Sequence, residues 1–177
     1  YTRDRSITPW IILGGTWEDF VDGVLTALAA PGAVFLDVGA NQGYYTVKIG
    51  GLVGPTGRVF AFEPNAKMYR FLTDNIELNA LQPRVSAYQV AAGAAAGTAQ
   101  LEVDDDYPGG ARVLLASLNE TAPKLVEVEV VKIDDAVPAD LVADLVKIDV
   151  EGFEPLVCEG MQNLLQRSPN AAIVCEI

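Results

Sequence analysis

The sequence predicts an α/β protein built on a mostly parallel sheet with helices on both faces. From residue 33 to the end, apolar runs of strand length alternate with segments whose apolar residues recur at helical spacing. At the centre of this pattern, residues 34–45 have the features of a buried strand, a glycine turn and a helix start. Strands and helices that alternate in this way form parallel βαβ units with right-handed crossovers.

Before the third strand, the elements are predicted from apolar spacing and turn residues. We expect residues 7–13, around Pro9, to be extended, and a helix to start at Thr16 with Asp19 in its cap. Asn65 is the expected N-cap of the helix that follows the second strand. The remaining elements are expected to be a strand over 33–38, a helix over 42–52, a strand over 58–63, a helix from Pro64 to Asn79 and a strand over 85–90.

A segment over residues 91–132 interrupts this rhythm. Its alternating residues predict strands over 98–103 and 126–130, so we expect a β-rich insertion between the third and fourth strands of the sheet. The three aspartates at 104–106 are expected to form a solvated loop, because their spacing is not that of a calcium site. After the insertion we expect a fourth strand over 145–149, one helix that begins near Pro155, and a fifth strand over 171–177.

The composition is that of one globular domain. The chain has 177 residues, and half of them are hydrophobic. We expect this domain to span residues 33–177, after a strand and helix lead-in over 1–32. No apolar run is long enough to cross a membrane, and no signal peptide is visible. We therefore expect a cytoplasmic protein without a membrane partner, although a segment before Tyr1 could have been removed.

Charge and residue types exclude several classes of function. A net charge of −12 argues against a nucleic-acid partner, because phosphate binding requires a basic surface. The chain has no histidine and no cysteine–histidine cluster, so we expect neither a metal site nor a histidine-based catalytic triad. Cys158 and Cys175 lie in apolar segments and are expected to be buried free thiols rather than a disulfide.

The glycine turn and its neighbouring acids indicate a nucleoside-containing ligand. Gly39 and Gly43 bracket a turn that lets a ligand approach the backbone at a helix start. Glu63 ends the second strand, where an acid accepts hydrogen bonds from ribose hydroxyls. The dinucleotide pattern G-x-G-x-x-G requires a glycine where Asn41 stands. Asp37, two residues before the turn, suits a ligand with an ammonium and a sulfonium, or only caps the turn.

Three sequence blocks occur here in the order and spacing of one family. They cover residues 36–45 (LDVGANQGYY), 62–65 (FEPN) and 147–152 (KIDVEG), with 175–177 (CEI) as a weaker echo. With these blocks the chain resembles the FkbM family of S-adenosylmethionine-dependent methyltransferases over roughly residues 33–177. The resemblance implies a Rossmann-like class I methyltransferase fold, S-adenosylmethionine as methyl donor, and O-methylation of a small molecule or a sugar. It does not name the acceptor.

The expected cofactor site gathers residues from three places in the chain. Glu63 should accept both ribose hydroxyls, Asn65 should lie near the adenine, and two small residues after the third strand should leave room for the ring. The full set is Asp37, Gly39, Ala40, Asn41, Gly43, Glu63, Asn65, Ala91 and Ala92. A complete fold of this class has seven strands. Because the sequence ends after the fifth, we expect the C-terminal edge strands to be missing and the acceptor pocket to be incomplete.

Asp149 and Glu151 are the candidate catalytic residues. Methyl transfer relies mostly on positioning, but a hydroxyl acceptor benefits from a nearby base. Asp149 ends the fourth strand beside the point where open α/β sheets bind ligands, and Glu151 follows in the turn. Both acids could instead only cap the next helix. Lys147 should share a strand face with Asp149, where it should form a salt bridge with this residue or could orient an acceptor. Glu176 could face either the pocket or solvent.

Two other functions stay open. Glu63 alone would fit an NAD(P)-dependent oxidoreductase, but the turn lacks its middle glycine, and no Tyr-x-x-x-Lys motif is seen on a helix after the fourth strand. The missing edge strands leave open a catalytically inactive or incomplete domain that only binds a nucleoside cofactor.

Overall fold

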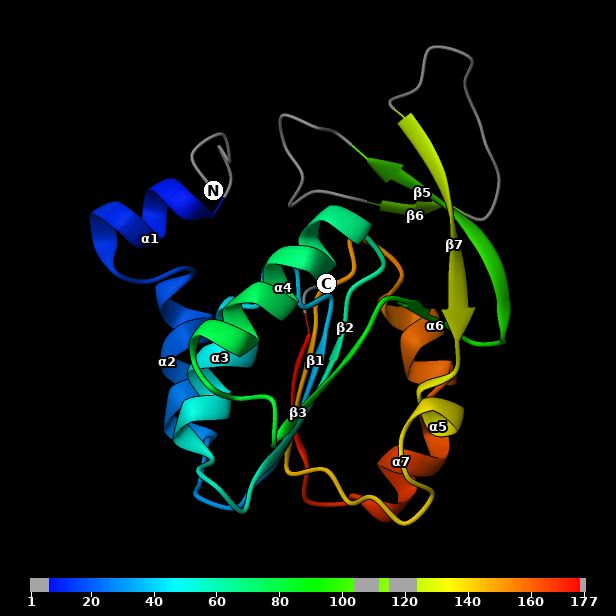
Figure 1. The fold of residues 1–177 in the computed structure, drawn as a ribbon. Helices are drawn as coiled ribbons and strands as arrows, with labels where there is room; N and C mark the ends of the chain where they lie inside the picture. The colour runs from blue at the N-terminus through cyan, green and yellow to red at the C-terminus, as the bar shows by residue number, and fades with distance from the viewer. Residues whose placement is uncertain (1–6, 104–111, 115–123, 176–177) are drawn as a thin grey trace.

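A five-stranded parallel sheet forms the centre of the fold (Figure 1). The computed structural model describes residues 7–103, 112–114 and 124–175. The strand order is β3-β2-β1-β8-β9, and every neighbouring pair is parallel, which confirms the predicted sheet. The strands are β1 (Val34–Val38), β2 (Arg58–Phe62), β3 (Val85–Tyr88), β8 (Leu145–Ile148) and β9 (Ala172–Cys175).

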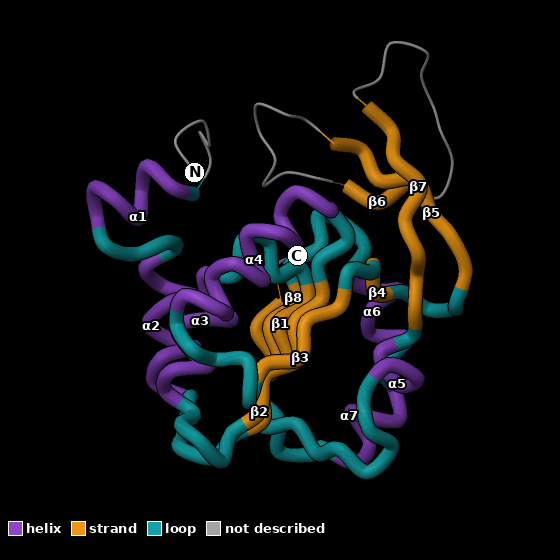
Figure 2. The backbone as a smooth tube through the Cα atoms, viewed as in Figure 1, coloured by secondary structure: helices purple, strands orange, loops and turns teal. Residues whose placement is uncertain are grey.

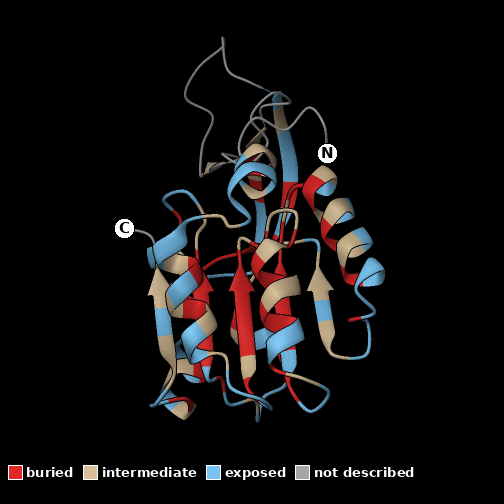
Figure 3. Ribbon diagram, turned by 90° about the vertical axis from the view of Figure 1, so that its left-hand side faces the viewer, coloured by how far each residue is buried: buried red, intermediate tan, exposed pale blue. Residues whose placement is uncertain are grey.

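Helices cover both faces of this sheet, as predicted (Figures 1 and 2). Side chains of β1 alternate between the two faces: Phe35 packs against the helices on one face, and Leu36 packs against the helices on the other. The middle of the sheet is therefore buried, whereas its edge strands are more exposed (Figure 3). The helices on the Phe35 face are α2 (Asp19–Leu28), α3 (Tyr44–Leu52) and α4 (Ala66–Leu78). Those on the Leu36 face are α5 (Ile133–Ala136), α6 (Glu154–Glu159) and α7 (Gln162–Arg167).

The expected β-rich insertion forms a second sheet, with strand order β4-β7-β5-β6. Its strands are β4 (Ala91–Ala92), β5 (Gly97–Val103), β6 (Arg112–Leu114) and β7 (Lys124–Val131). Leu101, Val128 and Val130 face Ala91 in a small core of their own. The predicted loop with three aspartates at 104–106 lies outside the described residues.

The expected extended lead-in over residues 7–13 is wrong, because a helix, α1 (Thr8–Gly14), occupies this segment. Pro9 lies in the first turn of α1, where its fixed φ favours a helix and its missing N–H is no loss. Gly15 ends the helix with a left-handed φ of 80°. The helix expected from Thr16 begins only at Asp19, because Glu18 adopts a left-handed φ of 49°. The Thr16 hydroxyl still donates to the Asp19 carboxylate.

The single helix expected after the fourth strand is also wrong, because a break at Gly160 divides it into α6 and α7. A Cβ on Gly160 would lie 1.9 Å from the carbonyl oxygen of Gly93, at the base of the second sheet. The Gly160 carbonyl accepts a hydrogen bond from the backbone N–H of Asp134. Contacts with distant parts of the chain therefore determine where α6 ends.

Several local predictions are confirmed. The Asn65 side chain caps α4 by accepting a hydrogen bond from the Lys67 N–H, and Asn79 ends that helix. Cys158 and Cys175 are free thiols, but half-buried rather than buried. Glu176 lies outside the described residues. Within the described ranges, no helix combines the length and the apolar character needed to cross a membrane.

Candidate functional site

A cavity lies at the carboxyl ends of β1, β2 and β8. Here the glycine turn and Glu63, which the sequence predicted to bind a ligand, meet the end of the fourth parallel strand. The glycine turn contributes Gly39 and Asn41, and the end of β2 contributes Glu63. Asp149 and Glu151, after β8, form the opposite rim. Carboxyl ends of neighbouring parallel strands are the usual ligand site of open α/β sheets.

Seven of the predicted site residues line this cavity, and four do not. Those on its wall are Gly39, Asn41, Glu63, Ala91, Ala92, Asp149 and Glu151. Ala40 instead packs beside Leu72 in the core, and Gly43 is the N-cap of α3. Asn65 caps α4, and Asp37 is completely buried beneath the turn. Cofactor binding by Asp37, Ala40, Gly43 and Asn65 stays a prediction.

Glu63 ties the glycine turn to the start of α4. Its carboxylate oxygens accept hydrogen bonds from the backbone N–H of Asn41, at 2.7 Å, and of Asn65, at 2.8 Å. Glu63 is only 6% exposed, and burial raises its pKa to about 7 against the lowering effect of these two N–H groups. Each carboxylate oxygen has two lone pairs, so one donor each leaves capacity for ligand hydroxyls.

Small and aromatic side chains form part of the remaining cavity wall. Ala91 and Ala92 are buried residues of β4, and Phe153 precedes α6. Phe62, the last residue of β2, stacks on Tyr88 with ring centroids 4.9 Å apart. A small apolar wall next to a hydrogen-bond acceptor suits a flat aromatic base joined to a sugar.

The glycine turn is held by its own chain on both sides. Gly39 has a φ of 81°, and a Cβ there would lie 1.8 Å from the carbonyl oxygen of Asp149. The N–H groups of Gly39 and Ala40 both donate to the carbonyl of Phe62. Gly39 therefore needs its positive φ, and the group that approaches it closely is the Asp149 backbone.

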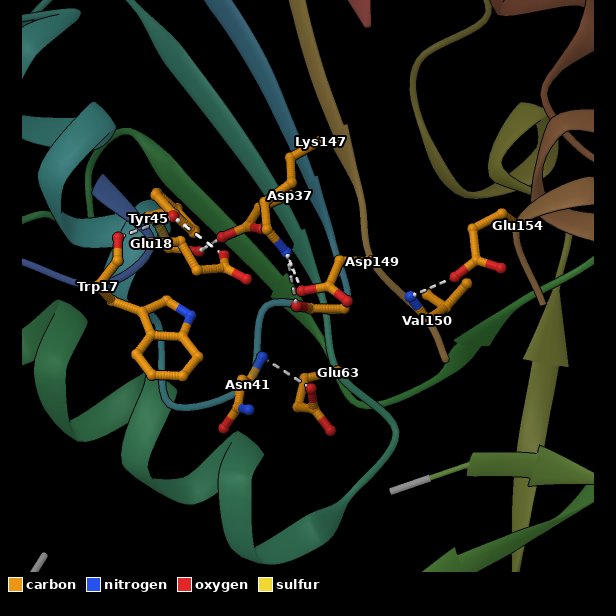
Figure 4. A network of polar contacts seen from close by, with 12 residues as sticks. Trp17, Glu18, Asp37, Asn41, Tyr45, Glu63, Lys147, Asp149, Val150 and Glu154 are labelled. Atoms are coloured by element: carbon orange, nitrogen blue, oxygen red, sulfur yellow. Dashed lines mark hydrogen bonds and ion pairs between the residues drawn. The ribbon is translucent and has the colours of Figure 1, made fainter. Parts of the chain in front are cut away.

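Lys147 connects the turn with both acids that flank it (Figure 4). Its Nζ lies 2.9 Å from Oδ2 of Asp149, 3.4 Å from the Gly39 carbonyl and 3.9 Å from Oδ1 of Asp37. The predicted salt bridge with Asp149 is thereby confirmed. Burial alone would lower the pKa of Lys147, but the carboxylates of Asp37 and Asp149 raise it. The pKa of Asp37 is raised by burial, against the lowering effect of Lys147 and the Thr46 hydroxyl.

Comparison with known proteins identifies the family. The methyltransferase FkbM domain matches residues 37–177, most of the chain. The chain belongs to the FkbM methyltransferase family. A comparison with curated protein sequences gives no match.

Solved structures with the same fold are distant in sequence from this FkbM-family chain. Methyltransferase FkbM from Methylobacillus flagellatus KT is 19% identical with a TM-score of 0.58, over 82% of this chain and 32% of that one. The precorrin-8w decarboxylase of Methanobacterium thermoautotrophicum is 15% identical with a TM-score of 0.52, over 90% and 62%. The C-terminal domain of precorrin-6Y C5,15-methyltransferase from Rhodobacter capsulatus is 20% identical with a TM-score of 0.51, over 92% and 64%. This chain thus spans less than two thirds of each of these structures, and the likeness establishes the Rossmann-like methyltransferase fold.

The structure of this FkbM-family domain adds three residues that the sequence did not assign to the site. The Tyr45 ring lies 5.5 Å from Nζ of Lys147, and its hydroxyl contacts Glu18. Glu154 accepts hydrogen bonds from the N–H groups of Val150 and Gly152, and so holds the loop after Asp149. Tyr45 stands inside a family block, but only its place in space shows its role. Glu154, at the start of a helix, resembles any first-turn acid in sequence.

Proposed function

We propose that this FkbM-family domain binds S-adenosylmethionine and transfers its methyl group to a hydroxyl of a small molecule or a sugar. The supporting observation is the charge around Lys147. Among the described residues, one ammonium is set against three carboxylates, those of Asp37, Asp149 and Glu18. An excess of negative charge favours a cationic ligand and disfavours a diphosphate. S-adenosylmethionine carries a sulfonium and an ammonium, whereas NAD carries a pyrophosphate.

The residues of the first cavity fit the nucleoside end of this cofactor. Glu63 would accept the ribose hydroxyls, and Ala91, Ala92 and Phe153 would contact the adenine. Oδ1 of Asp37 is buried and, within the described residues, accepts no hydrogen bond. Because Asp37 is also completely buried and does not line this cavity, we assign it an electrostatic role beneath the turn rather than a ligand contact.

We assign the contact with the acceptor hydroxyl to Asp149, because it lines the cavity just after β8. When bound, the cofactor supplies a methyl group activated by positively charged sulfur. Asp149 would accept a hydrogen bond from the acceptor hydroxyl and take its proton as the oxygen–carbon bond forms and the bond between the methyl carbon and sulfur breaks, its electron pair staying on sulfur. Glu151, also on the cavity rim, is the second candidate for this role.

The catalytic assignment is tested with Asp149→Asn, which keeps the shape of the side chain and removes its charge. Loss of a general base lowers turnover by about a hundredfold to ten-thousandfold. The assay follows transfer of a labelled methyl group to a panel of sugars and small hydroxylated molecules, using the longest form of the protein. Asp74→Asn, at an exposed position on α4, is the matched control. Full turnover by Asp149→Asn would show that Asp149 is not a general base and that catalysis depends only on the positioning of donor and acceptor.

Two calorimetric titrations test the choice of cofactor. We expect binding of S-adenosylmethionine and no detectable binding of NAD. The opposite result would favour the oxidoreductase. Binding of S-adenosylmethionine without turnover on any acceptor would favour a domain that only binds the cofactor.

A further inference from the structure

A second cavity lies beside the first, and Asp149 lines both. Its other wall residues include Glu18 and Val21 near the start of α2, Lys147 of β8 and Val174 of β9. Lys147 is 4% exposed, whereas Glu18 is an exposed residue. The cavity therefore presents two carboxylates and one ammonium within a small, partly apolar space.

Glu18 is aimed at this cavity by an unusual local conformation. It has a left-handed φ of 49°, which a non-glycine residue adopts at an energetic cost and which is common at functional sites. Glu18 is also the N-cap of α2, yet its side chain makes no capping hydrogen bond. Instead, Oε2 of Glu18 accepts a hydrogen bond of 3.3 Å from the Tyr45 hydroxyl (Figure 4).

Tyr45 also links Glu18 to Lys147. Its single hydroxyl hydrogen is shared between Glu18 and the Trp17 carbonyl oxygen, 3.2 Å away, which fixes the segment before α2 against α3. Its ring lies beside the Lys147 ammonium. Glu18 lies near enough to this ammonium to help raise the pKa of Lys147. The segment before α2 is thus part of the same charged network as the glycine turn.

We propose that the second cavity binds the amino-acid end of the cofactor, with Glu18 as a binding residue for its ammonium. Glu18 would accept a hydrogen bond from the ammonium, and Lys147 would face the carboxylate, while Asp149 stays available to the acceptor hydroxyl. A zwitterion matches a cavity that carries both signs of charge. This inference rests on the proposed binding of S-adenosylmethionine. The sequence suggested Asp37 as the acid that contacts the cationic end of the ligand. We assign this contact to Glu18 instead, because Asp37 is fully buried and lines neither cavity.

The position of the two cavities supports this assignment. The first has the ribose acceptor Glu63 and the apolar wall that a nucleoside needs. A ligand that extends from the ribose past Asp149 enters the second cavity, because Asp149 belongs to both walls. A methionine side chain joins the ribose to its charged end in this way, so one ligand would use both cavities.

The test compares two neutral-sulfur ligands that differ only by the amino-acid end. S-adenosylhomocysteine has this end, and 5′-methylthioadenosine lacks it. We expect Glu18→Gln to weaken binding of S-adenosylhomocysteine roughly tenfold, the effect of losing a charge-assisted hydrogen bond. Binding of 5′-methylthioadenosine should not change. Calorimetry on the purified protein measures both dissociation constants.

Two further variants distinguish a direct contact between Glu18 and the ligand from an indirect effect of Glu18 on the fold. Asp19→Asn removes the same charge from the next residue, which lines neither cavity, and should leave both affinities unchanged. Tyr45→Phe should weaken binding of S-adenosylhomocysteine by a few-fold and leave binding of 5′-methylthioadenosine unchanged, because it releases Glu18 and the Trp17 carbonyl and changes no group of the first cavity. Melting temperatures confirm that each variant is folded.

The outcomes distinguish the two proposals. Failure of the unmodified protein to bind either ligand overturns the proposed function. Normal binding of S-adenosylhomocysteine by Glu18→Gln overturns this inference alone, and leaves the second cavity to the acceptor. An equal loss for both ligands also overturns it, because Glu18 would then act through the fold.

Discussion

Glu63 should make ligand binding depend on pH near neutrality. Burial raises its pKa from 4.5 to about 7. Ribose hydroxyls that donate to the carboxylate favour its ionised form, so the ligand competes with a proton. Below pH 7 the affinity for S-adenosylhomocysteine should fall by up to about tenfold per pH unit. If the ligand returned the pKa of Glu63 from about 7 to its ordinary value of 4.5, the total effect on binding would be about 3 kcal/mol.

The raised pKa of Glu63 also makes the stability of the folded protein depend on pH. In the unfolded chain Glu63 ionises near pH 4.5, whereas in the folded chain it stays protonated up to about pH 7. The unfolded state therefore binds fewer protons between these values. The contribution of Glu63 to the free energy of unfolding is fully present below pH 4.5 and falls by up to about 3 kcal/mol as the pH rises to 7.

Calorimetry with S-adenosylhomocysteine between pH 5.5 and 8.5 measures the binding effect. Glu63→Gln should bind more weakly, with a dissociation constant that no longer varies near pH 7. Glu151→Gln changes another acid on the same cavity wall and should keep the pH dependence. A dissociation constant of the unmodified protein that is flat over this range would refute the role given to Glu63, as would an unchanged slope in Glu63→Gln.

Two further predictions concern the loops that hold the site. Gly39→Ala should lower the free energy of unfolding by at least about 2 kcal/mol, because it combines a positive φ with a Cβ 1.8 Å from the Asp149 carbonyl oxygen. Urea denaturation measures this change. Glu154→Ala should cost about 1 kcal/mol and release the loop after Asp149, since it removes the acceptor for two backbone N–H groups. Hydrogen exchange at Val150 and Gly152 should become faster.

Matched variants isolate the physical causes of these losses. Gly54 has a φ of 70° with open space around its Cβ position, so Gly54→Ala measures the conformational strain without the collision. Equal losses at Gly39 and Gly54 would remove the Asp149 carbonyl from the explanation. Glu159→Ala changes an acid at the opposite end of α6, and exchange in the loop as fast as in Glu154→Ala would show general destabilisation.

Interactions within one segment were predictable from sequence. Asn65 is recognisable as an N-cap because its hydrogen bond reaches only two residues ahead. Lys147 and Asp149 could be paired because residues two apart share a strand face. The contact between Lys147 and Asp37 depends instead on β1 and β8 being neighbours in register, which the order of elements along the chain does not state.

Predictions failed where distant parts of the chain decide the local structure. The break at Gly160 depends on Gly93, 67 residues earlier, which no pattern of apolar residues reveals. Glu18 falls within the helix expected from Thr16 and was not predicted to belong to the site, because its left-handed φ and its contact with Tyr45 exist only in the folded protein. Pro9 was given the wrong conformation because a proline fits both an extended segment and the first turn of a helix.

The contact between Gly93 and Gly160 has a mechanical consequence. Backbone rests on backbone here, with no side chain between them that could change rotamer and yield. Gly93 is also joined to the end of β7 by its N–H bond to the Val131 carbonyl. The base of the small sheet is therefore in direct backbone contact with the joint between α6 and α7, and a displacement of one would require a displacement of the other.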